Sequence, residues 1–431
     1  MDKDKISIFT AALMNMNMMI GVGAFMMPPL MAQKAGFSSF LGWPLTALII
    51  FPIVYSIAEI SKIFPGAGSF YNYSKNIINR TTGFASGWMF CAGYSGVAAL
   101  QTSCLRDIVR EYFSIDPTLF SILFVSLMAG ISLLKFSTVG KIQSMGTLFK
   151  LIPLIFVLLV FWAYINPGLS INTQNLFNVP FVVPLAIFGF WGFECCCTIS
   201  HLIKGGPNAA SKAIMWAFFT SVTIYTVFNF GLLNIMGVDN LISYGTEDFV
   251  RFLNLPFKPI EAALSLLIPA IVAVAYANAA LSVFVASSST IHAMACENLF
   301  PFSKSISKET ANKRPYIAIA VQAVLILTLI IIINSKFVLT SLSNIGVMIP
   351  YFLTLISLLV LQNRKNIKAK MIITIIAIGS WSIATYLSWL TLGTDNFTRL
   401  TALAPLLIIF VIGICLFLIN KRNDKEVRTS N

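Results

Sequence analysis

Charge-free apolar stretches of about twenty residues recur along the whole chain, and this pattern indicates a helical membrane protein. Hydrophobic residues make up 57% of the 431 residues and charged residues only 10%, whereas soluble domains carry roughly 25% charged residues. We predict an all-α integral membrane protein with twelve transmembrane helices. They cover residues 6–32, 35–60, 82–106, 117–135, 142–165, 179–203, 212–237, 260–292, 316–335, 337–362, 370–393 and 399–420. The first is too long in its apolar core for a cleaved signal peptide.

The formal net charge of +13 reports topology rather than nucleic-acid binding. With the N-terminus placed in the cytoplasm, 22 of the 29 Lys and Arg residues fall on the inner side of the predicted spans. An excess of basic residues on the cytoplasmic side is the positive-inside rule. We therefore expect a multi-pass protein of the cytoplasmic membrane with both termini cytoplasmic, in contact with the lipid bilayer and not with nucleic acid.

The stretches between the spans are too short to form a second domain, so residues 1–431 are expected to form one transmembrane unit. The outer stretch from Asp239 to Phe257 predicts a short surface helix over a vestibule, and residues 65–80 predict an interfacial helix. Cys195-Cys196-Cys197 resembles a metal cluster, but consecutive residues of an α-helix point about 100° apart. We interpret these cysteines as packing residues and expect neither a metal nor a cofactor.

Two spans are interrupted by glycines at matching places. Gly21-Val22-Gly23 lies in the middle of the first span, and Gly189-Phe190-Trp191-Gly192 lies in the sixth, about 170 residues later. Because the first span starts inside and the sixth outside, the broken helices run in opposite directions. Such pairs indicate a 5+5 inverted repeat and the binding site of a transporter. The first repeat then covers about 6–165, the second about 179–362, and residues 370–420 add two helices. The alternative is that the glycines only permit close helix packing.

An unwound stretch inside the bilayer leaves backbone groups free to act as ligands. The half-helix after Gly23 presents its positive N-terminal end, which suits a carboxylate. The half-helices ending near Ile20 and Phe188 present carbonyl groups, which suit an ammonium group. A site that binds a carboxylate and an ammonium a few ångströms apart fits an amino-acid zwitterion.

Two ionisable residues lie deep in otherwise apolar spans. Glu194 is the only charge between Leu151 and Ile203, and an intramembrane carboxyl group marks an ion or proton pathway unless backbone or tyrosine groups satisfy it structurally. Lys150 lies about 12 Å into the fifth span. It can exchange a proton, act as a fixed internal cation, or extend back to the headgroups.

Other polar and aromatic residues are weaker candidates. Tyr94 lies in a stretch of small residues and is expected to line the pocket, and one of the aromatic residues around the second break is expected to act as a gate. We interpret Glu59 and Glu261 as interfacial or structural and His201 as a surface residue. The aromatic gate candidates are Phe188, Phe190, Trp191 and Phe193.

Five sequence motifs over roughly residues 10–360 resemble the amino acid–polyamine–organocation (APC) transporter superfamily. They occur in the family's order and at matching topological positions. They are Gly21-Val22-Gly23-Ala24-Phe25; Glu59 with Phe64-Pro65-Gly66-Ala67-Gly68-Ser69-Phe70-Tyr71; Lys141-Ile142-Gln143 with Phe149-Lys150-Leu151-Ile152-Pro153; Phe190-Trp191-Gly192-Phe193-Glu194; and Ala293-Met294-Ala295-Cys296-Glu297-Asn298-Leu299-Phe300-Pro301.

The resemblance implies the leucine-transporter-type fold with discontinuous helices one and six and alternating access. It also implies that the Gly21–Gly23 backbone, with Ala24, binds the substrate carboxylate. Glu194 resembles an acidic residue implicated in the proton response of arginine–agmatine-type exchangers. Lys150 resembles a lysine that replaces a bound sodium ion in some relatives, with Ser287 and Ser288 facing it.

The chain departs from the family at two places. Val22 stands where a serine or other small polar residue is common, so a side-chain contact to the carboxylate is lost. Ser289-Thr290 stand where many relatives have an arginine.

The sequence therefore predicts a secondary active transporter of amino acids or related amines, proton-coupled or working by exchange, and not an enzyme. A transporter of another substrate class, such as a nucleobase or metal ion, is one alternative. A non-transporting nutrient sensor is another.

Overall fold

The computed structural model describes residues 5–66, 68–165, 173–206, 208–253 and 255–429, with the side chains of Leu202 and residues 422–429 excepted. These residues form helices and the loops between them. Within the described ranges the β-pairing is one isolated parallel bridge, between Ile6 and Ile203. The prediction of an all-helical chain is confirmed.

The first half of the chain begins with a broken helix and ends with a long one. It contains α1 (Ile8–Met19), α2 (Val22–Ala35), η1 (Gly36–Leu41), α3 (Gly42–Ile63), α4 (Ser69–Ile77), α5 (Arg80–Tyr112), α6 (Pro117–Ser132), α7 (Phe136–Val160) and η2 (Phe161–Tyr164). The break between α1 and α2 lies at Ile20-Gly21, so the first span is interrupted as predicted. The second half-helix begins at Val22 rather than after Gly23, so Val22 and Gly23 belong to the first turn of α2 and not to the unwound stretch. Pro28 and Pro29 lie inside α2 without ending it.

The second half begins with the other interrupted segment. It contains α8 (Thr173–Asn178), η3 (Val179–Val182), α9 (Val183–Phe188), η4 (Cys195–Thr198), η5 (Ser200–Leu202), α10 (Ala209–Met236), α11 (Val238–Tyr244), η6 (Phe249–Phe252), α12 (Lys258–Cys296), α13 (Ser303–Ile306), α14 (Tyr316–Ile332), α15 (Lys336–Arg364), α16 (Lys368–Leu390) and α17 (Asn396–Thr429). Helical residues thus occur in each of the twelve ranges predicted as spans.

The described residues contain seven segments that are long and apolar enough to cross a membrane. These are Val22–Ile63, Phe136–Tyr164, Ala209–Met236, Lys258–Cys296, Lys336–Arg364, Lys368–Leu390 and Asn396–Lys421. Shorter apolar helices occur at Ile8–Met19, Pro117–Ser132, Thr173–Phe188 and Tyr316–Ile332. The number and composition of these helices define a multi-pass membrane protein.

The interrupted segment in the second half differs from the prediction in one respect. The α-helix ends at Phe188, and residues 189–194 form turns before two short 3₁₀ helices, η4 and η5. The expectation that Cys195-Cys196-Cys197 lie on an α-helix is therefore wrong. A 3₁₀ helix has about three residues per turn, so the three side chains still diverge, and all three are buried.

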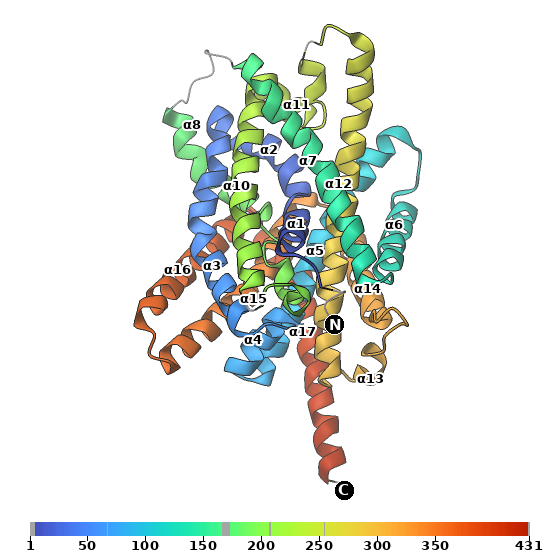
Figure 1. Cartoon of the computed structure of the whole chain (residues 1–431), viewed down its shortest axis with the longest axis vertical. Coiled ribbons are helices and arrows are strands. Elements are labelled where there is room, and N and C mark those ends of the chain that lie inside the picture. Colours follow the sequence, from blue (N-terminus) through green and yellow to red (C-terminus); the bar gives the residue numbers. More distant parts are fainter. Residues whose placement is uncertain (1–4, 67, 166–172, 207, 254, 430–431) are drawn as a thin grey trace.

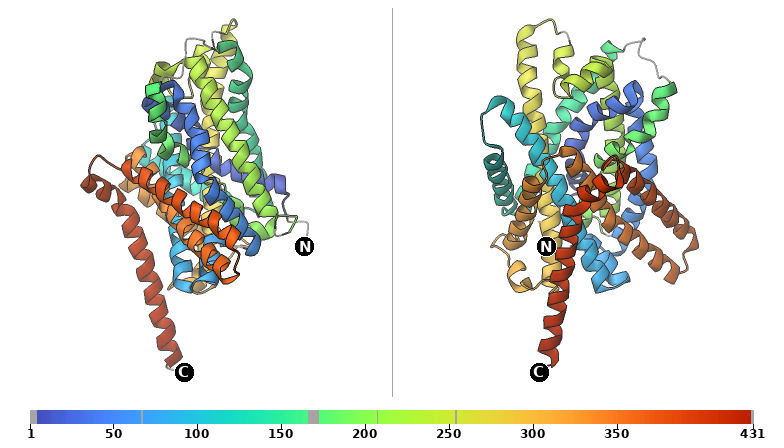
Figure 2. Two further views of the ribbon diagram at one scale, coloured as in Figure 1. Left: turned by 90° about the vertical axis from the view of Figure 1, so that its left-hand side faces the viewer. Right: turned by 180° about the vertical axis from the view of Figure 1, so that it is seen from behind.

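Helix α5 lies in the centre of the molecule and packs along α12 and α15. A Cβ on Gly93 would lie 2.5 Å from the backbone nitrogen of Val347, so a glycine is required where α5 crosses α15. The N-terminus lies in the same half of the molecule as the end of α17, which projects beyond the other helices (Figure 1; Figure 2).

Two short helices occupy the loops where surface helices were expected. Helix α11 lies within the predicted outer stretch. Helix α4 is present inside residues 65–80, but Phe70, Tyr71 and Tyr73 are fully buried against α5 and α15. One face of α4 therefore packs into the helical bundle, and the interfacial position of this segment stays a prediction.

Candidate functional site

The two breaks lie against each other in the interior. A Cβ on Gly23 would overlap the Cα of Gly189 and lie 3.0 Å from its nitrogen, so the two backbones are in direct contact. At the far end of the second break, Gly192 has a φ of +111°, a region that favours glycine, and it packs against Cβ and Cγ of Met18. Close packing is thus one role of these glycines, as the alternative interpretation of the sequence proposed.

The first break also leaves backbone groups without partners. The Gly21 N–H donates to the Met19 carbonyl at 3.0 Å, and the Ala24 N–H donates to the Gly21 carbonyl at 3.1 Å. Among the described residues, no hydrogen bond reaches the N–H groups of Val22 and Gly23. These N–H groups lie in the first turn of α2, at the positive end of its dipole.

Lys150 binds the other side of the same break. Its Nζ donates to the Asn17 carbonyl at 2.5 Å. In a continuous helix this carbonyl would accept from the Gly21 N–H, which here bonds to Met19 instead. Lys150 is fully buried, and no carboxylate within the described ranges forms an ion pair with it. Its ammonium group therefore caps a helix end in place of the missing N–H.

An amide network surrounds this contact. Asn17 Nδ2 donates to Ser282 Oγ at 2.7 Å and to the Asn278 carbonyl at 3.0 Å, and Asn278 Nδ2 donates to Asn17 Oδ1 at 2.6 Å. Asn278 Nδ2 also donates to the Gln143 carbonyl at 3.0 Å. A Cβ on Gly146 would overlap the Asn278 amide, so a glycine in α7 makes room for it.

Ser287 and Ser288, which the resemblance places opposite Lys150, make no hydrogen bond to it. Ser288 Oγ donates to the Phe284 carbonyl of its own helix at 2.5 Å, and Ser287 Oγ is buried without a partner in the described structure. The residues of α12 in the network at Lys150 are Asn278 and Ser282, more than one helical turn earlier.

Glu194 is fully buried at the second break. The Tyr94 hydroxyl donates to its Oε1, and the Gly192 N–H donates to its Oε2 at 3.3 Å. Tyr351 lies beside the same carboxyl group and packs edge-on against Trp191, with ring centroids 5.4 Å apart. The contacts expected for a structural carboxylate, from a tyrosine and from the backbone, are thus both present.

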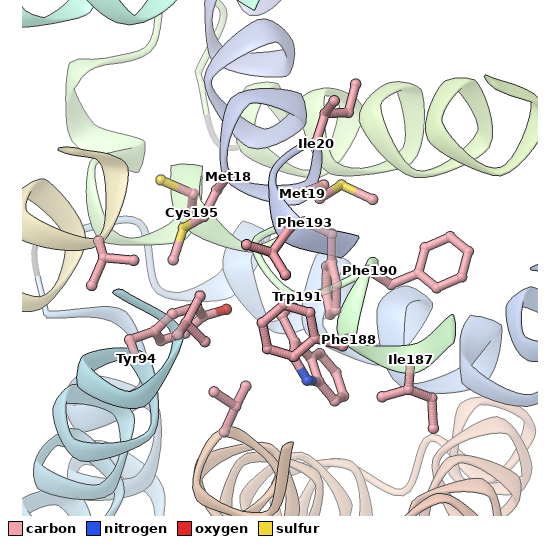
Figure 3. Close-up of a cluster of buried hydrophobic side chains, with 14 of the residues drawn as sticks. Met18, Met19, Ile20, Tyr94, Ile187, Phe188, Phe190, Trp191, Phe193 and Cys195 are labelled. Carbon is pink, nitrogen blue, oxygen red and sulfur yellow. The ribbon is translucent and has the colours of Figure 1, made fainter. Parts of the chain in front are cut away.

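The aromatic gate candidates point in different directions (Figure 3). Trp191 donates from Nε1 to Asn344 Oδ1 at 2.5 Å and lies on the side of Tyr94 and Tyr351. Phe190 points away from Tyr94 and packs against Trp43 with ring centroids 5.9 Å apart. Phe188 is buried where α9 ends. Phe193 packs against Tyr351 with ring centroids 5.6 Å apart. Of the four candidates, Trp191 and Phe193 therefore contact the surroundings of Glu194.

A cavity of about 340 Å³ lies beyond the breaks, between α2, α5, α12 and the loop after α11. Phe25 and Tyr276 form part of its wall, with ring centroids 6.4 Å apart. Four carboxyl groups and two basic groups also line it, namely Asp107, Glu111, Glu247, Asp248, Arg251 and Lys336. Desolvation at the cavity wall raises the pKa of Glu247.

At the end of the molecule opposite to this cavity, where α1 begins, polar contacts join several segments. Glu297 binds Lys75 and accepts from the Tyr71 hydroxyl at 2.8 Å, while Arg80 donates to its carbonyl. The Gly66 N–H donates to Ser200 Oγ at 2.8 Å. The structure is therefore open at the end where α2 finishes and closed at the end where α1 begins.

The remaining candidates lie in ion pairs or at the surface, as expected for residues without a role in the site. Glu59 pairs with Lys62 and Lys370, and Glu261 pairs with Lys258 at 2.7 Å. His201 is exposed. In the part of the chain that the structure describes, no group of three His, Cys, Asp or Glu side chains is arranged to hold a metal ion.

The asparagines of α1 were not among the residues predicted from the sequence. Asn15 donates to Cys196 Sγ at 3.2 Å and accepts from the Cys196 N–H at 2.8 Å, while Asn17 pairs with Asn278. The available signal was an amide side chain in a charge-free span, which requires a partner from another helix. Asn15 and Asn17 lie in the same span, so each of them needs a hydrogen-bonding partner from another segment.

The architecture is that of a multi-pass helical membrane protein with two interrupted segments in contact. A family model described as amino acid permease matches residues 6–417. The chain belongs to the amino acid permease family, whose members are transporters and not enzymes.

Individual relatives are similar at low identity. The serine/threonine exchanger SteT of Bacillus subtilis (strain 168) is 23% identical over 379 residues, 84% of each chain. An arginine/agmatine antiporter of Chlamydia caviae is 27% identical over 269 residues, 56% of this chain and 54% of the relative. The aromatic amino acid transport protein AroP of Escherichia coli O6:H1 is 26% identical over 192 residues, 43% and 41%.

Proposed function

We propose that this chain is a secondary active transporter of amino acids or related amines that works by alternating access, with the substrate bound where the two breaks meet. The observation that carries the proposal is the contact between the breaks, beside which lie the unpaired N–H groups of Val22 and Gly23 and the buried carboxyl group of Glu194. The N–H groups suit a carboxylate and the acidic group suits an ammonium.

The proposed topology has twelve spans, a 5+5 inverted repeat over about 6–165 and 179–362, and both termini in the cytoplasm. The helices found in all twelve predicted ranges support it, as does the distribution of Lys and Arg. In this topology the cavity faces outward and the contacts of Glu297 close the cytoplasmic side. Transport then requires these contacts to open while the outer cavity closes.

The substrate site is closed in this conformation. Gly21, Val22, Gly23, Ala24, Tyr94, Phe188, Phe190 and Trp191 are all buried. The Gly189 backbone is in direct contact with the first turn of α2 at Gly23. We infer that the segment from Gly189 to Glu194 moves away from α2 when substrate binds. Because Val22 carries no polar group, binding of the carboxylate relies on backbone N–H groups.

Proton coupling is proposed for Lys150 and Glu194. A buried ammonium without a counter-ion is costly, and Lys150 is held by a single carbonyl group at the break. If Lys150 loses its proton, its hydrogen bond to the end of α1 is no longer charge-assisted and weakens, so proton binding and the position of α1 are linked. The cation position that Lys150 occupies also argues against sodium coupling.

The test is counterflow in proteoliposomes against a panel of amino acids and polyamines, with and without a pH gradient. Accumulation of a labelled amino acid against its unlabelled form would establish transport and its substrate. Stimulation by the pH gradient would separate proton coupling from exchange. No counterflow with any panel member, from protein that is folded, would contradict the proposal and favour a sensor.

A further inference from the structure

A line of buried polar side chains leads from Lys150 along α7 toward the start of that helix. Gln143, Thr147 and Lys150 lie four and three residues apart, on one helix face, and all three are fully buried. Asn17 from α1 and Asn278 from α12 form the facing walls. We call these five residues, with Ser144 and Ser282, the polar seam.

The seam contains polar atoms that the protein leaves unsatisfied. Both side-chain atoms of Gln143, Ser144 Oγ and Asn278 Oδ1 are buried and have no hydrogen-bond partner within the described ranges. Each unsatisfied buried group costs about 1–3 kcal/mol, and buried water normally satisfies such groups. Gln143 and Ser144 are adjacent in α7, and Asn278 is bonded to the Gln143 carbonyl, so we infer that water binds these four atoms.

Among the described residues, no titratable side chain forms a hydrogen bond or an ion pair with Lys150. The described part of α1 carries no titratable residue, and those of α7, α10 and α12 face elsewhere. On α10, the Tyr225 hydroxyl donates to the Gly189 carbonyl and Lys212 is exposed, as is Lys141 on α7. On α12, Tyr276 faces Glu247 and Lys258 pairs with Glu261. At the end of α12, His292 pairs with Glu309 and contacts Cys296. Tyr164 of η2, which also packs on α7, donates to the Leu253 carbonyl. Water is therefore the available proton acceptor.

The two ends of the seam differ in packing. Beyond Lys150, the buried face of α7 continues with Pro153, Leu154 and Val157, which are apolar. Toward the start of α7, Gln143 lies about 10 Å from Lys150 and about 10 Å from the first residue of the helix. Between Gln143 and that residue the face carries the buried Val139 and Gly140, and an added Cβ on Gly140 would meet no atom within 4 Å, so there is open space beside the helix on this side. In the proposed topology this start is cytoplasmic, so the polar side of the seam leads to the cytoplasm.

We propose that the polar seam is the route by which Lys150 exchanges its proton with the cytoplasm, with Gln143 as the residue that holds the connecting water. The Lys150 ammonium releases one proton to a seam water, the water passes it to cytoplasmic solvent, and a neutral amine remains. The return step is the reverse. This inference rests on the proposed role of Lys150 in proton coupling.

The experiment uses Gln143→Leu in proteoliposomes whose internal and external pH are varied separately. We expect the change in uptake rate with internal pH to become about tenfold smaller, because the loss of one hydrogen bond lowers a rate by about that factor. Substrate should still stabilise the protein against heat. The matched control is Gln322→Leu, because Gln322 is also fully buried and lies in α14, where it bonds Ser95. It should keep the wild-type response.

A second variant covers the case in which Gln143→Leu does not fold. Gln143→Glu keeps the size and adds a group that can carry a proton, so it should speed the response to internal pH. A wild-type response in either folded variant overturns the seam as the route. Lys150→Ala separates the two claims. If it transports with an unchanged pH response, the proton role of Lys150 and the seam both fail. If it loses the response but Gln143→Leu keeps it, only the seam fails.

Discussion

Gly23→Ala tests whether the contact between the two breaks sets the closed conformation. The methyl group would overlap Gly189 Cα and lie 3.0 Å from Gly189 N, whereas ordinary contacts of a carbon atom are about 3.5–4 Å. Both partners are backbone atoms, so no side chain can rotate to relieve the overlap. The substitution therefore has to push the second break away from α2.

The size of the effect follows from two opposing terms. Overpacking a tight interface costs about 1–3 kcal/mol. Alanine in the first turn of α2 recovers up to about 1 kcal/mol of helix propensity. With the full recovery, the net result is a loss of up to about 2 kcal/mol in the closed conformation, a factor of up to about 30 in its population. Conformations in which Gly189 has left α2 do not bear this cost and gain population.

The assay compares Gly23→Ala with Gly379→Ala, a matched change in α16 where an added Cβ meets no atom within 4 Å. Thermal unfolding of the purified protein should show Gly23→Ala to be less stable than wild type and Gly379→Ala to be equal or more stable. Substrate should recover part of the loss in Gly23→Ala, because binding requires the same separation. Equal stability of the two variants would refute the proposed contact.

Three further outcomes are expected. Glu194→Gln should flatten the pH dependence of uptake, measured at constant substrate, and an unchanged profile would remove Glu194 from proton coupling. Glu297→Gln should weaken the inner closure by about 0.5–1 kcal/mol, since its ion pair is half-exposed. A cysteine placed at the buried Ser200 should then be modified about 2–5-fold faster; an unchanged rate would argue against this closure. Burial raises the pKa of Glu247, so its contribution to stability is present below its ordinary pKa and is lost as pH rises through the raised value. Unfolding temperatures of Glu247→Gln should therefore fall less between pH 5 and 8 than those of wild type, and parallel curves would contradict this.

The positions of the helices and of the breaks could be predicted because they depend on local sequence. Long apolar runs specify helices in lipid, and glycine lowers helix stability where it stands. The break at Ile20-Gly21 and the end of α9 at Phe188 follow these local rules. The 3₁₀ geometry of Cys195–Thr198 could not be predicted this way, because it depends on the tie between Asn15 and Cys196 of another segment.

The partners of the charged residues could not be predicted either. That Lys150 and Glu194 are buried follows from their place in apolar spans, but their contacts depend on how each helix is rotated about its axis. Tyr94 is 100 positions from Glu194, and Asn17 is 133 from Lys150. The resemblance placed Ser287 and Ser288 opposite the lysine, whereas the rotation of α12 brings Asn278 and Ser282 to the network.

The contacts of α1 also indicate where the molecule can bend. Asn15 fixes α1 to η4, and Asn17 fixes it to α12. In both cases the side-chain amide donates one hydrogen bond and accepts another. By contrast, the start of α2 meets the second break through the glycine backbone of Gly23 and Gly189. Because directional bonds resist sliding more than van der Waals contacts do, we expect α1 to move with α12 and η4 while α2 turns about Ile20-Gly21. Lys150 binds the last turn of α1 beside this hinge, so the loss of its proton would weaken the fixed side of the hinge and allow the inner end to open.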